Sequence, residues 1–348
     1  MSSQAACRPP ASYAQPAATL TATGCVDAKD PTKPAPGLIA YDVASPLWSD
    51  GAAKQRFMAI PDGARIHVKD CAREPGTCKP KAEGGTSDDE GHFVFPVGTV
   101  LVKNFLFRAS IFETRLLMKL SAERWVGYSY RWNAQHSDAE LVGEDGTGQP
   151  IANDAGAMQR WYFPSRSDCL LCHNAAVGAS LGLETRQLDI DFTYPSGVTA
   201  NQIDTLEGMG LFDAPVKRVA PLPSPSSRVS GGMDDRATLD QRARSYLHAN
   251  CAICHRPEGP FPGIDLRFGV ERKAMGICNV DATKGSAGAQ PAAQAKRLVP
   301  GHPELSTMYT RMATLDATVR MPQVATSLVD AVGALVIADW IKSIAACP

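Results

Sequence analysis

The chain has 348 residues, of which 44% are hydrophobic and 20% charged, a composition expected of an ordinary globular protein with two or three domains. Its 35 basic and 36 acidic side chains leave a net charge of −1. That near-balance excludes the basic excess typical of proteins that bind nucleic acid or anionic membranes. No apolar run is long enough to predict a transmembrane segment.

Residues 1–38 are rich in Pro, Ala and Thr without helical or strand periodicity, and they predict a loosely ordered, extended arm. The start, MSSQAACRPP, lacks the basic and apolar regions of a secretion signal. The protein is therefore either cytosolic or exported by a leader absent from this chain. Cys7 follows AA, as at the end of a lipoprotein cleavage site, which gives weak support for a lipid anchor there.

Residues 39–162 consist of short β-type runs between turn residues, among them RFMAI, FVFPVGTVLVKNFLFR, TRLLMKL and RWVGYSYRW. Several short strands at this spacing predict a sandwich or barrel-like β domain, and we expect a β-sandwich-like one. The acidic, glycine-rich KAEGGTSDDEGH within it predicts an exposed loop.

Residues 163–234 are mostly irregular and end in a linker-like stretch, APLPSPSSRVSGGMDD. From residue 235 to 348 the pattern becomes helical. Thr238 and Gln241 form a capping-box signature, followed by one apolar face at Leu239, Ala243, Tyr246 and Leu247. Near the C-terminus an apolar stripe predicts a closing helix, at Val332, Val336, Trp340 and Ile344.

Two cysteines three apart and an adjacent histidine occur twice, at Cys169, Cys172 and His173 and at Cys251, Cys254 and His255. Three kinds of site use such residues. The thiols add to the two vinyl groups of a c-type haem while the imidazole binds its iron. Alternatively, the cysteines bind zinc, or they form a redox dithiol.

The repetition of the whole pentapeptide favours haem. Zinc does not require a histidine directly after both second cysteines, and paired zinc knuckles normally lie closer than the roughly 80 residues found here. A redox dithiol belongs at the start of a helix after a strand, whereas the second motif follows a predicted helix. The sequence therefore predicts two covalently bound haem c groups.

The other six cysteines are an even number, which fits three disulfides. Pro-Gly between Cys71 and Cys78 favours a turn that brings this pair together. The next pairings we expect are Cys7–Cys25 and Cys278–Cys347, and free buried cysteines are the alternative. Disulfides would indicate an oxidising compartment.

A haem that only transfers electrons usually has a sixth iron ligand. For the second haem the prediction is Met321, which precedes Pro322 and stands 66 positions after His255. Its rivals, Met308 and Met312, lie in a predicted helix. A methionine that fills the core is the ordinary alternative.

The first haem has several ligand candidates. Met209 lies 36 residues after His173 between glycines that permit close approach. Met158 and His136 are alternatives, although a lone histidine is more often a surface or core residue. An open or water-bound iron also remains an alternative.

Residues 235–348 resemble a class I cytochrome c domain through CAICH, RMP and the flanking helices. From residue 39 onward the chain is similar to an uncharacterised bacterial family of secreted dihaem c-type cytochromes. The similarity lies in the segments YDVASPLWSDGAAKQRFMAIPDGARI, FPVGTVLVKNF, YRWN, FPSRSDCLLCH and RARSYLHANCAICHRPEG. The resemblance implies two haems, export and electron transfer. The expected fold is α+β multidomain, a β-sandwich-like domain followed by a mostly α-helical cytochrome c region.

The leading functional hypothesis is an electron carrier, in the periplasm or secreted, between a redox enzyme such as a dehydrogenase and an acceptor. The alternative is a peroxidase- or oxygenase-like enzyme with an open first haem fed by the second, so the sequence leaves open whether the chain is an enzyme. Residues offered for a distal pocket are His136, Trp161, Tyr162 and Arg166, although Arg166 suits a haem propionate equally. A third hypothesis gives the aromatic RWVGYSYRW a carbohydrate ligand, although strand aromatics are usually core.

Overall fold

The computed structural model describes residues 7–71, 73–74, 90–225, 237–283, 295–324 and 326–348. The chain forms two compact units. The first unit comprises Met1–Val43, Gly51–Lys69 and Gly91–Ala220, and the second comprises Ala44–Asp50, Asp70–Glu90 and Pro221–Pro348. The first Cys-x-x-Cys-His segment belongs to the first unit and the second segment to the second unit.

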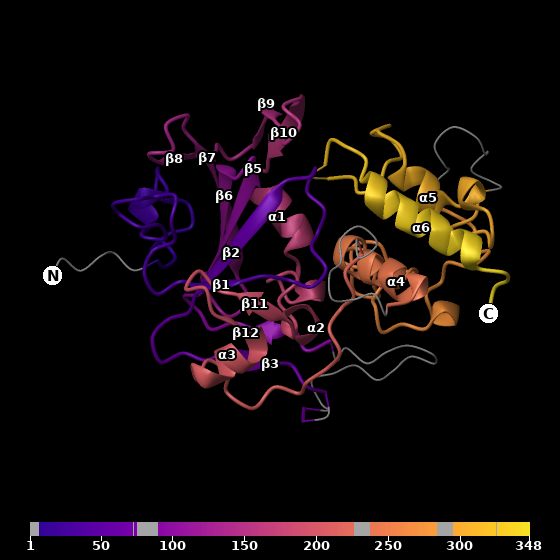
Figure 1. Ribbon diagram of the computed structural model, residues 1–348, viewed down its shortest axis with the longest axis horizontal. Coiled ribbons are helices and arrows are strands. Elements are labelled where there is room, and N and C mark those ends of the chain that lie inside the picture. Colours follow the sequence, from indigo (N-terminus) through magenta and orange to yellow (C-terminus); the bar gives the residue numbers. More distant parts are fainter. Residues whose placement is uncertain (1–6, 72, 75–89, 226–236, 284–294, 325) are drawn as a thin grey trace. The chain divides into compact units, whose positions relative to one another are not determined.

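The first unit is built on a six-stranded antiparallel sheet in the order β1-β2-β5-β6-β7-β8 (Figure 1). Consecutive long strands are neighbours, because short turns join β5, β6 and β7. The strands are β1 (Ile39–Tyr41), β2 (Ala53–Ala59), β5 (Val100–Phe107), β6 (Ser110–Lys119), β7 (Trp125–Trp132) and β8 (Ala139–Leu141).

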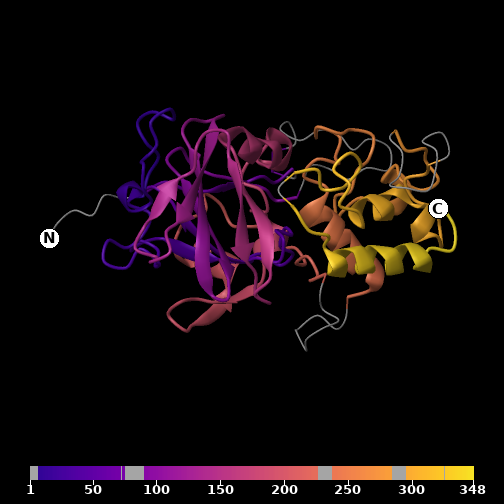
Figure 2. The same ribbon diagram turned by 90° about the horizontal axis from the view of Figure 1, so that it is seen from above.

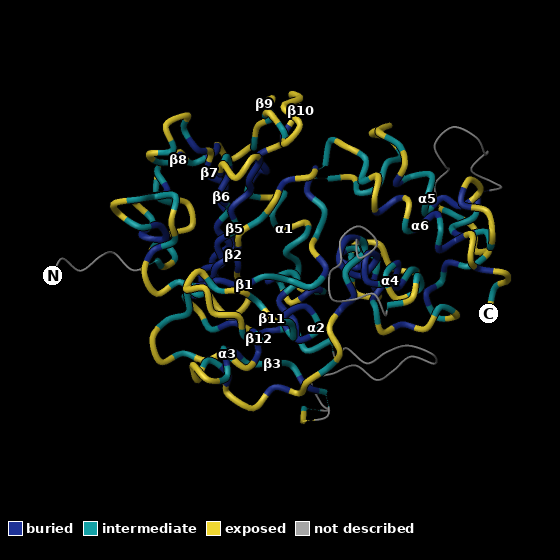
Figure 3. The backbone as a smooth tube through the Cα atoms, in the orientation of Figure 1, coloured by how far each residue is buried: buried dark blue, intermediate teal, exposed yellow. Residues whose placement is uncertain are grey.

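Apolar side chains cover both faces of this sheet. Val102 pairs with Leu116 on one face, and Leu101 pairs with Leu117 on the other. All four are buried, and Figure 3 shows much of the central strands in the colour of buried residues. The sheet therefore lies between two cores, since side chains alternate along each strand.

The N-terminal arm packs on the first of these faces. The Cys7–Cys25 disulfide forms, Leu20 is fully buried, and the Leu20 amide donates to the Ala139 carbonyl of β8. The described part of the arm is therefore packed, and the prediction of a loosely ordered segment was wrong for it. The sulfur of Cys7 is bonded to Cys25, so it does not carry a lipid.

Short elements cover the second face. Their buried residues include Phe93, Leu183, Leu188, Ile203 and Phe212, which pack with Met58, Leu101 and Leu117 of the sheet. The remaining elements of the unit are β3 (His67–Val68), β4 (Phe93–Val94), β9 (Thr147–Ala152), β10 (Met158–Phe163), α1 (Arg166–Cys172), α2 (Thr185–Leu188), β11 (Asp191–Thr193), β12 (Thr199–Asn201) and α3 (Gln202–Gly208). Phe192 of β11 packs on the first face.

The second unit contains α4 (Leu239–Asn250), α5 (Thr307–Met312) and α6 (Ala331–Ser343), connected by long irregular chain (Figure 2). The predicted capping box begins α4: the Thr238 hydroxyl accepts from the Gln241 amide, and the Gln241 side chain accepts from the Thr238 amide. Trp340 of α6 is fully buried and donates to Asp240. The predicted Cys278–Cys347 disulfide joins the irregular chain to the C-terminus.

The fold-class prediction was wrong. The structure is 24% strand and 20% helix, dominated by one antiparallel sheet, and a mostly α-helical cytochrome c region does not fit it. A β-sandwich is also absent from the described residues, because irregular chain and short helices cover the sheet where a second sheet was expected. Alternating sequence predicts strands but does not reveal what packs against them.

The apolar stripe predicted for the last helix is only partly buried. Trp340 and Ile344 are buried as expected, but Val332 is 51% exposed. Ile337 and Ile341 supply the rest of the packed face. A spacing of four residues rotates by about 40° per step around a helix of 3.6 residues per turn, so a stripe of four such positions leaves the core.

Three sequence predictions fall on chain outside the described residues: most of the exposed loop KAEGGTSDDEGH, most of the linker, and Cys78. Cys71 is disulfide-bonded. Among the described helices, none is both long and apolar enough to cross a membrane.

Candidate functional site

Helix α1 carries the first motif directly after strand β10. Ser165 caps its N-terminus, where the Ser165 hydroxyl accepts from the Asp168 amide and the Asp168 carboxylate accepts from the Ser165 amide. The Tyr162 hydroxyl also donates to Asp168, at 2.9 Å. This closed set of hydrogen bonds determines where Cys169 and Cys172 lie, one helical turn apart.

Cys169 lies against strand β7 at Gly127. A β-carbon added to Gly127 would be 2.6 Å from both the β-carbon and the sulfur of Cys169, closer than side chains pack. The absence of a side chain therefore lets α1 approach the sheet. Gly127 pairs with Leu117, so this contact is on the second face.

His173 caps the C-terminal end of α1, and its Nδ1 is 2.8 Å from the Ala179 carbonyl. Burial, followed by the positive charge of Lys103, lowers the pKa of His173 to about 3. The ring is thus neutral at ordinary pH, Nδ1 carries the proton donated to Ala179, and Nε2 keeps its lone pair. This is the arrangement of a metal-binding histidine held by an outer hydrogen bond.

The second motif follows α4 in irregular chain, as predicted. Cys251 caps the helix, and the amides of Cys254 and His255 both donate to the Cys251 carbonyl, which turns the segment back on itself. Burial, and then the charge of Cys254, raises the pKa of Cys251 to about 12.

His255 is partly buried beside Phe261, with ring centroids 5.8 Å apart. Its Nδ1 is buried and makes no hydrogen bond of good geometry within the described chain. Burial and the charge of Arg311 lower the pKa of His255, while the Phe261 backbone opposes them. This imidazole is therefore also held as the neutral, ligating form.

Met321, the predicted ligand of the second haem, lines a pocket of the second unit. The Met321 amide donates to the carbonyl of Arg311, the residue whose charge acts on His255. The pocket is also lined by Trp48, Tyr246, Met312, Thr314, Arg320, Pro322, Thr326, Leu328 and Asp330. Met312, the alternative ligand to Met321, lines the same pocket. The helix predicted around Met308 and Met312 is confirmed as α5.

Met209, predicted for the first haem, lies at the C-terminal end of α3 with its side chain 54% exposed. The alternatives are no better placed. Met158 is 64% exposed, and His136 is hydrogen-bonded to Ser110 and stacked on Trp132. Nothing in the described contacts brings any of these three to His173, so the sixth ligand of the first haem remains a prediction.

The residues offered for a distal pocket are engaged elsewhere. Arg166 pairs with Glu144 at 2.8 Å. Trp161 is buried and donates to Glu113 at 2.8 Å, and the Tyr162 hydroxyl donates to Asp168. The aromatic residues of RWVGYSYRW are buried in the core, which leaves none of them for a carbohydrate: Trp125, Tyr128, Tyr130 and Trp132.

The cysteine environments do not suit a redox dithiol. That chemistry uses the thiolate, which a lowered pKa favours, whereas burial raises the pKa of Cys169, Cys251 and Cys254. Cys169 also lies in the middle of α1 rather than at its N-terminus. Across the described residues, no group of three ligand atoms close enough for a metal includes a motif cysteine.

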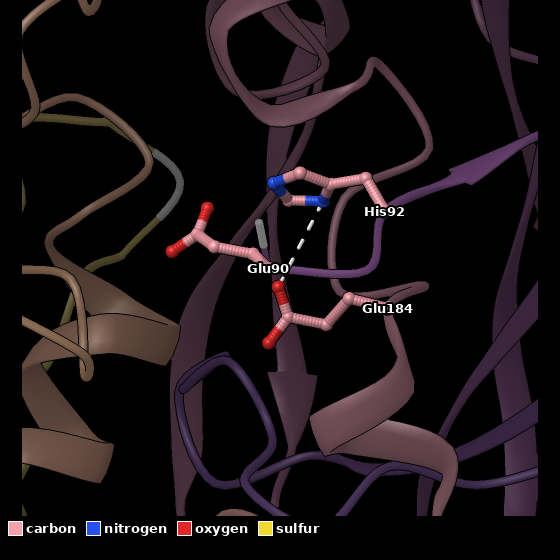
Figure 4. A group of neighbouring side chains, drawn as sticks. All are labelled: Glu90, His92 and Glu184. Atoms are coloured by element: carbon pink, nitrogen blue, oxygen red, sulfur yellow. Dashed lines mark ion pairs between the residues drawn. The ribbon is translucent and has the colours of Figure 1, made fainter. Parts of the chain in front are cut away.

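A pair formed by half-buried His92 and buried Glu184 lies elsewhere in the first unit. The Nδ1 of His92 is 3.8 Å from Glu184, as the dashed line in Figure 4 marks. Glu90, also drawn there, belongs to the second unit, where its carboxylate is 2.9 Å from Arg256 and 3.7 Å from His248. Because Glu90 already neutralises cations, the pair does not form a convincing metal site.

A row of basic side chains near the first motif was missed by sequence reasoning. Arg56, Lys103 and Arg115 occupy adjacent strands at one register. Burial, then Arg56 and Arg115, lowers the pKa of Lys103 to about 7, while Cys172 and Cys169 oppose this. The signal in the sequence was a basic residue inside each of three apolar strands.

Comparison of the chain with protein-family models, with curated proteins and with solved structures found no match.

Proposed function

We propose that the protein is a dihaem c-type cytochrome that carries electrons between a redox enzyme and an acceptor. One observation carries the proposal. Cysteines 7, 25, 71, 278 and 347 are in disulfides, whereas all four cysteines of the two Cys-x-x-Cys-His segments keep their thiols. The other described cysteines are oxidised to disulfides. The four thiols of these segments therefore remain available for a different covalent bond.

The residues present fit haem c. Each segment offers two thiols for thioether bonds and an adjacent neutral imidazole for iron. His173 keeps Nε2 available because Nδ1 donates to Ala179. Raised thiol pKa values do not oppose this attachment, because its product is an uncharged thioether.

The proposal needs no helical cytochrome domain. Attachment depends on five consecutive residues, and both pentapeptides form tight turns or helix ends. The α-helical region expected around the second haem is not part of the proposal. What remains is a β-sheet unit with one attachment segment and a largely irregular unit with the other.

The residues offered for a distal pocket are bound to other groups, which favours an electron carrier over a peroxidase or oxygenase. Acid–base chemistry at an open iron requires a side chain free to move a proton near the substrate. Arg166, Trp161 and His136 are each held by another group. A bound haem supplies one-electron chemistry, and the chain supplies its ligands, its electrostatic surroundings and a docking surface.

The two confirmed disulfides are compatible with a location outside the reducing cytosol, and we propose the periplasm or the cell exterior. Export would bring the chain to the compartment where its proposed redox partner works.

The mass of the denatured polypeptide tests the proposal. The protein is expressed with a secretion leader in a bacterium that has cytochrome-maturation machinery, then unfolded and weighed. We expect the mass of the chain plus two haems. Replacing both Cys169 and Cys172 by Ala should remove one haem, and replacing both Cys251 and Cys254 should remove the other. A mass equal to the bare chain would contradict the proposal.

The spin state of the ferric protein separates the carrier from the enzyme. A carrier should show two low-spin haems that do not respond to cyanide or peroxide. A high-spin signal that is lost in the Cys169/Cys172 double variant would instead support the open-site enzyme.

A further inference from the structure

Three cations form a straight row across the second face of the sheet. Arg56 of β2 pairs with Lys103 of β5, and Lys103 pairs with Arg115 of β6. The next partner in the row is Ser129 of β7. Neighbouring strands lie about 4.8 Å apart, so the row places three positive charges within about 10 Å on one surface.

The outer two cations have carboxylate partners. Arg56 pairs with Asp42, and Arg115 donates twice to Glu113, at 2.8 and 2.9 Å. Glu113 is fully buried and also accepts from Ser129 and Trp161. Its oxygens therefore have no capacity left for a further cation.

Lys103 lies between these two pairs and has no partner of its own. Its ammonium group makes no hydrogen bond or ion pair to any residue that the structure describes. The side chain is partly buried, and two guanidinium groups flank it. Holding an uncompensated cation there is costly, which is why the pKa of Lys103 falls to about 7.

The row begins close to the first attachment motif. Gly127, which contacts Cys169, is two residues before Ser129 on the same face of β7. From that point the row runs across β6 and β5 to β2, away from the strand that contacts the thiol. In haem c the two propionates leave the edge of the porphyrin opposite the two thioether bonds.

We propose that Arg56, Lys103 and Arg115 bind the propionate carboxylates of the first haem. This inference rests on the proposed function, because it assumes that a haem is attached at Cys169 and Cys172. Carboxylates would supply the anion that Lys103 lacks, and guanidinium groups suit such acceptors. The row is thus the part of the site that orients the first porphyrin across the sheet.

The test compares Lys103→Met with Lys103→Arg in the haem-loaded protein. A positive charge near a haem disfavours its oxidised, more positive state, so removing the charge should lower the reduction potential. We expect Lys103→Met to lower one of the two potentials by a tenfold change in its one-electron equilibrium, about 59 mV. Lys103→Arg should keep the parent potential. The other haem should not respond to either change.

The control is Lys33→Met, which removes an exposed cation of the same unit that pairs with Asp30. It should leave both potentials unchanged. The mass of each denatured variant is measured in parallel. A parent that carries no haem refutes the proposed function, whereas two haems with potentials indifferent to Lys103→Met refute this inference alone.

Loss of one haem in Lys103→Met but not in Lys103→Arg also supports the inference, because it shows that the charge is needed. Loss of that haem in both variants would overturn the inference, since the shape of the lysine rather than its charge would then be what the site requires.

Discussion

The two Cys-x-x-Cys-His segments share their residue spacing but are set in different surroundings. The first lies on α1 against a β-sheet, with a glycine beneath its first thiol and a row of cations beside it. The second lies in irregular chain after α4, and its unit contains a methionine-lined pocket. Under the proposed function the comparison separates two tasks: the pentapeptide would specify haem attachment, and the surrounding fold would set the electrostatics of each haem.

Positive charge raises a reduction potential, and so does a methionine ligand. If both haems are attached as proposed, each would have its own means of reaching a high potential: the cation row for the first and the thioether of Met321 for the second. Changes in one unit should alter one haem only. The methionine predictions below test that independence, and the other two test the surroundings of the first segment.

The largest effect is expected from Met321. Replacing Met321 by Leu keeps the volume of the side chain but removes its sulfur, so the second haem should lose a ligand and its potential should fall by well over about 59 mV. Redox titration monitored by absorbance measures this. Met312→Leu changes the other methionine of the same pocket and should have little effect.

Met209→Leu provides the comparison in the first unit. Its side chain is 54% exposed, so we expect no change in either potential. A fall in the first potential would identify Met209 as the missing ligand. If Met312→Leu rather than Met321→Leu lowers the second potential, the assignment of Met321 is wrong.

The effect of Gly127 should be smaller and confined to the first unit. Replacing Gly127 by Ala places a methyl group 2.6 Å from the sulfur of Cys169, and we expect a loss of about 1–3 kcal/mol in the free energy of unfolding. Gly143→Ala is the matched control, because no atom lies within 4 Å of its added β-carbon. Urea unfolding of both variants measures the difference, and equal stabilities would show that α1 does not depend on this close approach.

Much of the local structure was predictable from neighbouring residues. The capping box at Thr238, the disulfides Cys7–Cys25 and Cys278–Cys347, and the buried aromatics of β7 were all expected and are confirmed. Each depends on short spacing, on pairing of a few cysteines, or on the general burial of strand aromatics. Such signals are visible without knowledge of tertiary contacts.

The errors concern contacts between segments distant in sequence. A second sheet was expected where α2, α3 and irregular chain pack, because strand periodicity does not say what covers a sheet. The helical cytochrome region was inferred from two motifs and two helices. The long irregular segments between them leave the structure less helical than that inference required.

The cation row was missed for a related reason. Arg56, Lys103 and Arg115 are separated by 47 and 12 residues, and only the strand register aligns them. A basic residue within an apolar strand is unremarkable alone. Three of them become a site when their strands are adjacent and in register, which sequence reasoning could not establish.

The last expected effect is a dependence of stability on pH that distinguishes haem-free from haem-loaded protein. Burial and two arginines lower the pKa of Lys103 from 10.5 to about 7 in the folded chain. Between these values the unfolded chain binds more protons than the folded one, so the free energy of unfolding rises with pH. The penalty that Lys103 contributes is complete below pH 7 and is relieved as pH approaches 10.5, with a slope of at most about 1.4 kcal/mol per pH unit from this group. Burial and the same cations also lower the pKa of Lys54, so the comparison with Lys103→Met isolates the contribution of Lys103.

Urea unfolding at several pH values between 6 and 10 measures this slope in a haem-free variant with all four motif cysteines replaced by Ala. Lys103→Met in that background should be more stable than its parent near pH 7, and the difference should vanish toward pH 10. In the haem-loaded protein, carboxylates beside Lys103 would restore its pKa and flatten the slope. If the haem-free and haem-loaded proteins show the same slope, no anion reaches Lys103 when haem binds. Packing alone would then determine how the first Cys-x-x-Cys-His segment is held.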